Sequence, residues 1–324
     1  KDRLFTADHG YTRRCASGVL VYATPVLGGL LADRWLGMRK SVIFGGILLC
    51  LGHFGMAFEG HPAQRIDGVV VQDAAALQML YLSLSLIILG VGFLKPNIST
   101  IVGKLYADND PRRDSGFSIY YAGINIGALM ASLFAAWLGE TFGWRFGFGA
   151  AGVGMLLGLV TFTRGQKHLM GHAEPPRPAQ LSQSILGPLT REHLIYLLSL
   201  LMLLAIFTLI QLHSLMLNAV SFLPEMSAVL WSMHAVSAVL LTGIFWFMFT
   251  RCTRVERQQM TVLLALIACC LIFFTIYEQT YGSWVLFSDR AMNRHFVIDW
   301  TAGPPTFLGT FFLVVLAPLL SMLW

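Results

Sequence analysis

Long apolar runs recur along this chain, and short charged loops separate them. Several runs reach about 20 residues, the length that an α-helix needs to cross the hydrocarbon core of a bilayer. None of them alternates apolar and polar residues as the strands of a membrane β-barrel do. Only 12% of the 324 residues are charged, whereas soluble domains carry roughly 25% charged residues. We therefore expect an all-α membrane protein.

The runs predict nine membrane-spanning segments, at residues 16–32, 41–58, 77–105, 115–138, 146–163, 194–220, 228–250, 260–286 and 303–324. Alternating loops place thirteen basic residues on one side, which the positive-inside rule makes the cytoplasmic side. These residues are Arg34, Arg39, Lys40, Lys104, Arg112, Arg113, Arg164, Lys167, Arg177, Arg191, Arg251, Arg254 and Arg257. Because the basic residues lie in such loops, the net charge of +5 does not indicate binding of nucleic acid.

We expect neither a metal centre nor an enzyme active site, and no cofactor. The five cysteines are Cys15, Cys50, Cys252, Cys269 and Cys270, and their spacing fits neither a metal site nor a disulfide framework. The apolar runs also hold no paired nucleophile and base, so no catalytic residue is assigned.

Lys95 places an ammonium group inside the apolar segment 77–105. A charge at such a depth is costly, and it usually faces a cavity or a charged partner. The next residue, Pro96, removes a backbone donor and can kink the helix. Lys95 is therefore a candidate for substrate binding and proton coupling. The alternative is a lysine whose long side chain reaches the membrane surface.

Glu278 is the complementary charge, within an apolar run from Ala265 to Phe287. A carboxylate in low-dielectric surroundings takes up a proton more readily, and a nearby cation opposes that uptake. Glu278 is therefore the candidate proton site. The alternative is a structural ion pair between Glu278 and Lys95.

Tyr121 and Asn125 stand four residues apart, so a helix presents both side chains on one face. The amide of Asn125 offers donors and acceptors that match a peptide backbone, and Tyr121 adds a hydroxyl group on an apolar body. We expect both residues to bind substrate. The alternative is a polar contact that holds two helices together.

The motif GGLLADRWLGMRK, from Gly28 to Lys40, joins the end of one span to the start of the next. Its glycines allow close helix approach. Asp33 can pair with Arg34, Arg39 and Lys40 and so lock a short cytoplasmic turn. Here the sequence resembles the major facilitator superfamily, whose loop between helices two and three carries this kind of gating motif.

Three stretches are similar to the proton-dependent oligopeptide transporter family, bacterial type: YATPVLGGLLADR (22–34), GFLKPNISTIVGKLY (92–106) and RRDSGFSIYYAGINIGA (112–128). The resemblance implies a partial major facilitator fold of about nine helices, without helix one and helices nine to twelve. It assigns 1–166 to an N-terminal bundle (helices two to six) and 167–193 to a cytoplasmic linker. It assigns 194–250 to two extra bacterial helices and 251–324 to the start of the C-terminal bundle (helices seven and eight).

The resemblance also implies a function, namely a proton-coupled symporter that imports di- and tripeptides by alternating access. Such a protein is a multi-pass protein of the bacterial cytoplasmic (inner) membrane, driven by the proton gradient, and we expect a monomer. Its partners would be peptides, protons and the lipid bilayer, without nucleic acid. The alternatives are a transporter of another small substrate, such as nitrate or a drug, and a transport-inactive sensor or scaffold on the same fold.

Family resemblance further implies that Tyr22 lines the peptide cavity, and the alternative is a buried tyrosine bonded to a neighbouring helix. Ser283 and Trp284 can complete the cavity wall or simply pack. The resemblance pairs Lys95 with a peptide carboxylate or with carboxylates of the absent helices, and it pairs Glu278 with an arginine of helix one.

Overall fold

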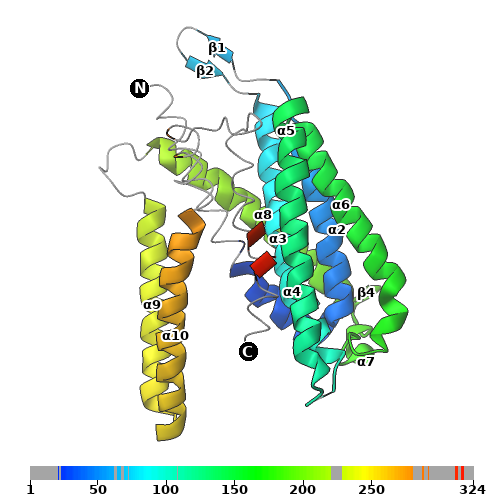
Figure 1. Ribbon diagram of the computed structural model, residues 1–324, viewed down its shortest axis with the longest axis vertical. Helices are drawn as coiled ribbons and strands as arrows, with labels where there is room; N and C mark the ends of the chain where they lie inside the picture. Colours follow the sequence, from blue (N-terminus) through cyan, green and yellow to red (C-terminus); the bar gives the residue numbers. More distant parts are fainter. Residues whose placement is uncertain are drawn as a thin grey trace. The chain divides into compact units, whose positions relative to one another are not determined.

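The computed structural model of the protein describes residues 21, 23–61, 64–66, 69–71, 73–107, 109–219, 228–279, 287, 291, 311–312 and 315–316. Figure 1 shows long helices joined by shorter segments, with two small strand hairpins. The described residues divide into two compact units. The larger unit holds the helices up to Gln211, and the smaller unit holds α9 and α10.

In the larger unit, residues 23–31 are helical and continue into the π-helical turn η1 (Ala32–Leu36). The elements that follow are α2 (Met38–Met56), β1 (Gln64–Ile66), β2 (Val69–Val71), α3 (Ala74–Lys104), α4 (Arg112–Met130), η2 (Ala131–Ala135), α5 (Ala136–Phe142), α6 (Trp144–Gly165), η3 (Gln166–Leu169), α7 (Pro178–Leu181), β3 (Ser184–Leu186), β4 (Leu189–Thr190) and α8 (Arg191–Ala219). Both strand pairs are antiparallel. The smaller unit holds the end of α8, from Leu212 on, with α9 (Ala228–Arg251) and α10 (Arg254–Glu278).

The expected all-helical membrane architecture is confirmed, with two short hairpins added between helices. Five helices of the described chain are long and apolar enough to cross a membrane. Eight of the nine predicted segments contain a helix. The ninth, 303–324, lies outside the described residues except for 311–312 and 315–316, which are helical.

Side-chain caps explain where two of these helices begin. Asp73 accepts hydrogen bonds from the backbone N–H groups of Ala75 and Ala76, at 3.0 and 3.2 Å, and so starts α3. Thr253 and Glu256 form a reciprocal capping box at the start of α10. As a result α10 begins at Arg254, six residues before the start at residue 260 that hydrophobicity alone predicts.

Close packing of α2 against α3 forms the centre of the larger unit. A Cβ atom added at Gly45 would lie 2.6 Å from the carbonyl oxygen of Gly90, and one added at Gly90 would lie 2.8 Å from the carbonyl oxygen of Gly45. Only glycine allows two helix backbones to come this near. In a bilayer, where helices gain nothing by leaving an apolar solvent, such contact is a main source of packing energy.

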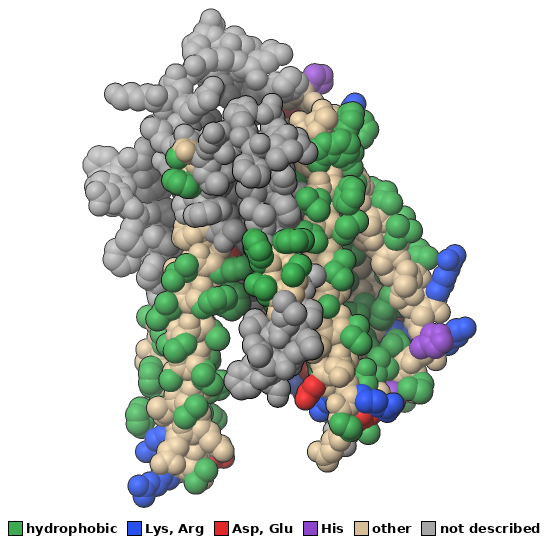
Figure 2. All heavy atoms as spheres, viewed as in Figure 1, with side chains coloured by type: hydrophobic (Ala, Val, Ile, Leu, Met, Phe, Trp, Pro, Cys, Tyr) green, Lys and Arg blue, Asp and Glu red, His purple; other side chains and the backbone are tan. Residues whose placement is uncertain are grey.

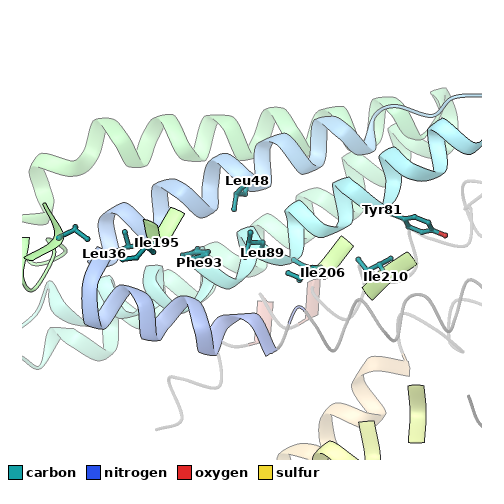
Figure 3. Close-up of a cluster of buried hydrophobic side chains, with 10 residues drawn as sticks. Leu36, Leu48, Tyr81, Leu89, Phe93, Ile195, Ile206 and Ile210 are labelled. Atoms are coloured by element: carbon teal, nitrogen blue, oxygen red, sulfur yellow. The ribbon is translucent and has the colours of Figure 1, made fainter. Parts of the chain in front are cut away.

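A buried cluster continues this contact toward α8 (Figure 3). Leu89 and Phe93 of α3 are fully buried in it, together with Leu48 of α2. Ile195 and Ile206 of α8 complete the cluster. Thus the first part of α8 belongs to the same compact unit as α2 and α3, although the predicted division of the chain at 166 and 193 remains a prediction.

Gly45→Ala is expected to destabilise the protein, because the added methyl group meets backbone atoms that no side-chain rotation can move. Overpacking of this kind costs about 1–3 kcal/mol. The measurement is the thermal unfolding midpoint of the purified full-length protein in detergent, and it should fall.

The matched control is Gly154→Ala in α6, where an added Cβ would meet no atom of the described chain within 4 Å. This variant should keep or slightly raise the midpoint, since alanine favours a helix over glycine. Equal midpoints for the two variants would contradict the packing described above.

Candidate substrate and proton site

Lys95 lies outside the packed face that α3 presents to the described residues of the larger unit. Two residues before it, Phe93 is 1% exposed, and two residues after it, Asn97 is 2% exposed, whereas Lys95 is exposed. The packed face of α3 lies against α2 and the helix at residues 23–31. The ammonium group therefore does not belong to the core of this unit, and its roles in substrate binding and proton coupling remain predictions.

Pro96 removes the N–H group that would bond to the carbonyl of Gly92 in a regular helix. The helix at residues 23–31 approaches this carbonyl so closely that a Cβ atom at Gly28 would overlap its oxygen. One turn further on, the hydroxyl group of Thr100 donates to the carbonyl oxygen of Pro96 at 2.8 Å. The protein itself thus surrounds the interrupted backbone next to Lys95.

Two buried polar residues, which the sequence analysis did not single out, join the helix at residues 23–31 to α3. The hydroxyl group of Thr24 donates to the carbonyl oxygen of Ile88 at 3.0 Å. The amide of Asn97 donates to the carbonyl oxygen of Phe93 at 2.7 Å and lies 3.5 Å from that of Gly28. The signal that could have identified them in the sequence is a polar residue within an apolar helical run.

Tyr121 and Asn125 do share one face of α4, as their spacing predicts. The amide nitrogen of Asn125 donates to the backbone oxygen of Tyr121 at 2.8 Å. Tyr121 is exposed and Asn125 is half-buried. One of the two N–H donors of the amide is therefore used within the helix, and the other N–H and the carbonyl oxygen are left for a substrate. The predicted substrate role of both residues is neither supported nor contradicted by this geometry.

Glu278 is the last residue of α10 and is exposed. It belongs to the smaller unit, whereas Lys95, Tyr121 and Asn125 belong to the larger one. Its role as the proton site and its pairing with Lys95 stay predictions. Three further predicted site residues, Tyr22, Ser283 and Trp284, lie outside the described residues.

The loop motif has different partners from those expected. We expected Arg39 to pair with Asp33, but its guanidinium bonds to Gln166 at 2.8 Å and to Glu174 at 2.9 Å. Asp33 and Arg34 are exposed, and Asp33 makes no salt bridge to any described residue. The reason is that the turn at Gly37 separates η1, which holds Asp33, from α2, which holds Arg39. The two side chains therefore do not lie on one continuous helix, and Arg39 points toward the segment after α6.

The linker at 167–193 is folded onto this motif. Lys40 forms a salt bridge with Glu192 at 2.6 Å. The backbone N–H of Arg39 donates to the carbonyl oxygen of Ala173 at 2.9 Å. Ala173 and Leu181 are each 2% exposed, although the surrounding sequence is polar. The segment is therefore a docked part of the larger unit at this end of the helices.

Gly37 makes this docking possible. Its φ of 76° lies in the region that favours glycine, and a Cβ atom there would lie 2.5 Å from the backbone nitrogen of Pro175. The loop motif and the linker are thus in backbone contact at this position.

Comparison with known proteins agrees with this architecture. The sequence model of the POT family matches residues 39–324. The uncharacterized transporter YclF of Bacillus subtilis is 32% identical over 315 residues, which cover 95% of this chain and 57% of YclF. The di-/tripeptide transporter of Lactococcus lactis is 29% identical over 317 residues, which cover 95% of this chain and 58% of that protein.

A solved structure is also similar, namely that of a variant peptide transporter in complex with alafosfalin. Its TM-score is 0.68 at 29% sequence identity, and the match covers 95% of this chain and 57% of that chain. The chain therefore spans less than two thirds of the length of each of these relatives.

The long apolar helices and the similarity to this solved structure show a membrane protein of the major facilitator fold. The chain belongs to the POT family. It is a multi-pass protein of the bacterial cytoplasmic membrane, as the apolar helices and the bacterial relatives indicate.

Gly37→Ala is expected to release the docked linker, since it adds both backbone strain and a clash with Pro175. Strain of this kind costs about 1–3 kcal/mol. Hydrogen exchange of the backbone amides in residues 172–181, followed by mass spectrometry, should become about tenfold faster or more.

Gly187→Ala is the control for this experiment. Gly187 also has a positive φ, of 54°, but an added Cβ would meet no described atom within 4 Å. Exchange in residues 172–181 should therefore match the unmodified protein. If both variants behave alike, contact with Gly37 does not hold the linker.

Proposed function

We propose that the full-length protein imports di- and tripeptides together with protons by alternating access, and that it does so as a monomer. The family membership supports this proposal. So do the relatives named a di-/tripeptide transporter and a peptide transporter bound to alafosfalin.

The observation that carries the proposal is the position of Lys95. A cation in the membrane-spanning part of a helix is costly unless it serves a cavity, a pathway or a partner. Here the packed face of α3 leaves Lys95 exposed, and Tyr121 on α4 is exposed as well. A zwitterionic peptide carries a carboxylate that an ammonium group can bind, and its backbone amides match the groups of Asn125.

Coupling to protons would come from Glu278. When Glu278 binds a proton from the outside, any ion pair that it makes is broken, and the equilibrium between outward-open and inward-open states shifts. Release of the proton on the inside restores the pair. The two states would differ by rocking of one helical bundle against the other. Because the proton binds outside and leaves inside, the proton gradient can drive net peptide uptake.

Glu278→Gln is expected to reduce proton-driven uptake to background, because an amide cannot carry the proton. Counterflow exchange of peptide, which needs no net proton transfer, should be partly kept. The measurement is uptake of labelled di- and tripeptides into proteoliposomes that hold the full-length protein, with and without an inward proton gradient.

Glu256→Gln on the same helix is the matched control. Glu256 belongs to the capping box at the start of α10, where glutamine serves as well as glutamate. Its proton-driven uptake should equal that of the unmodified protein. Full proton-driven uptake by Glu278→Gln would remove Glu278 from the proposed mechanism.

A further inference from the structure

A cavity of about 680 Å³ opens between the last turn of α3 and the first turns of α4. It lies at the end of the larger unit that the loop charges place in the cytoplasm. Figure 2 shows Lys, Arg and His side chains gathered mainly at this lower end of the helices, with hydrophobic side chains along the helices above. The cavity is distinct from Lys95 and from the loop motif, since neither lines it.

The cavity is lined by cations. Lys104 comes from the end of α3, Arg113 from the start of α4, and His172 from the docked linker. No carboxylate lines the cavity among the described residues, and neither Lys104 nor Arg113 has a salt-bridge partner there. The geometry therefore leaves two permanent positive charges and one imidazole facing the same space.

The nearest acidic residue of the described loop is already bound elsewhere. Asp110 accepts hydrogen bonds from the guanidinium of Arg112, at 2.8 and 3.1 Å. These bonds hold the pKa of the Asp110 carboxyl below its usual range. Arg112 thus has a salt-bridge partner, whereas its neighbour Arg113 has none in the part of the chain that the structure describes.

Backbone packing shapes the cavity and holds its donors. A Cβ atom at Gly103 would lie 3.2 Å from the ring of Phe117 and 3.5 Å from the guanidinium of Arg113, so that only a small residue fits beside them. Gly116 is buried against the ring of Tyr106, and a Cβ atom there would overlap this ring. The phenol group of Tyr106 is thereby fixed at the wall as a further hydrogen-bond donor.

Other hydroxyl groups at the wall are not free to donate. Those of Ser99 and Thr100 both donate to the carbonyl oxygen of Pro96, at 3.1 and 2.8 Å. The donors left for a ligand are the ammonium, guanidinium and imidazole groups and the phenol. This set matches a phosphate group, whose oxygens accept several charged hydrogen bonds at once.

We infer that this cavity binds a phosphate group, presented by the headgroup of an anionic phospholipid in the cytoplasmic leaflet. Basic pockets between membrane helices on the cytoplasmic side suit such headgroups. The neighbouring surface of α4 is apolar and exposed, with Ile119 at 74% exposure, and it can lie along an acyl chain. None of the described residues proposed for peptide transport lines this cavity. The test below measures lipid binding and not uptake, so it can fail independently of the proposed function.

The test uses the full-length protein purified in a nonionic detergent at low salt. Short-chain phosphatidylglycerol is titrated, and binding is followed by native mass spectrometry and by the thermal unfolding midpoint. Binding should saturate. A basic side chain near an anionic lipid surface raises the binding affinity by a factor of about five. Arg113→Gln should therefore weaken lipid binding about fivefold, and the double variant Arg113→Gln, Lys104→Gln about 25-fold.

Arg112→Gln is the matched control, since it removes the same charge at the next position without lining the cavity. It should leave affinity within twofold. Arg113→Lys keeps the charge and should retain most of the lipid binding. This variant shows whether Arg113→Gln weakens binding by removing the charge or by disturbing the fold. Equal weakening by Arg112→Gln and Arg113→Gln, or equal binding of phosphatidylcholine, whose zwitterionic headgroup has no net charge, would overturn the inference.

Inorganic phosphate distinguishes the two sources of the group. Competition by phosphate against phosphatidylglycerol supports a phosphate site that lipid fills. Saturable binding of phosphate that depends on Arg113, without binding of the lipid, keeps the phosphate chemistry and overturns the lipid as its source.

Discussion

Backbone contact between α2 and α3 is the constraint on which the larger unit depends. Lipid tails are as apolar as leucine, so helices in a bilayer are held by close packing and by polar contacts between them. The glycines at positions 45 and 90 allow that packing. Once α3 is pressed against α2 in this register, its rotation is set. Phe93 and Asn97 become buried, and Lys95 is left on another face.

The same packing accommodates the irregular backbone beside Lys95. A carbonyl without its helical donor is unfavourable in hydrocarbon and is tolerated where protein or water surrounds it. At Gly92 the helix at residues 23–31 fills that place, and Thr24 and Asn97 add polar contacts on either side. A proline and a cation can therefore stand next to each other in a membrane helix.

Much of the fold could be predicted from hydrophobicity, because the number and rough position of membrane helices follow from the length of apolar runs. The start of α10 could have been predicted as well, since Thr253 and Glu256 have the spacing of a capping box. The docking of the linker could not. Arg39 finds Gln166 and Glu174 more than a hundred positions away, and a polar composition does not reveal that Ala173 is buried.

The candidate site divides in the same way. Local spacing correctly placed Tyr121 and Asn125 on one face, because a helix repeat is a local property. Which cation faces which carboxylate depends on the arrangement of separate bundles, and no local pattern encodes it. The cavity at the end of α3 shows a further limit, since His172 of the docked linker joins Lys104 and Arg113 there from far along the chain.

Folding of the linker onto the larger unit also has a practical consequence for labelling. Two positive-φ glycines have opposite surroundings here. Gly37 of the loop motif presses on the linker, whereas Gly187 of the linker stands in the open turn between β3 and β4. Exposed turns of this kind tolerate inserted sequence. A fluorophore or epitope tag placed at Gly187 would travel rigidly with the larger unit and would report its movement as a fixed marker.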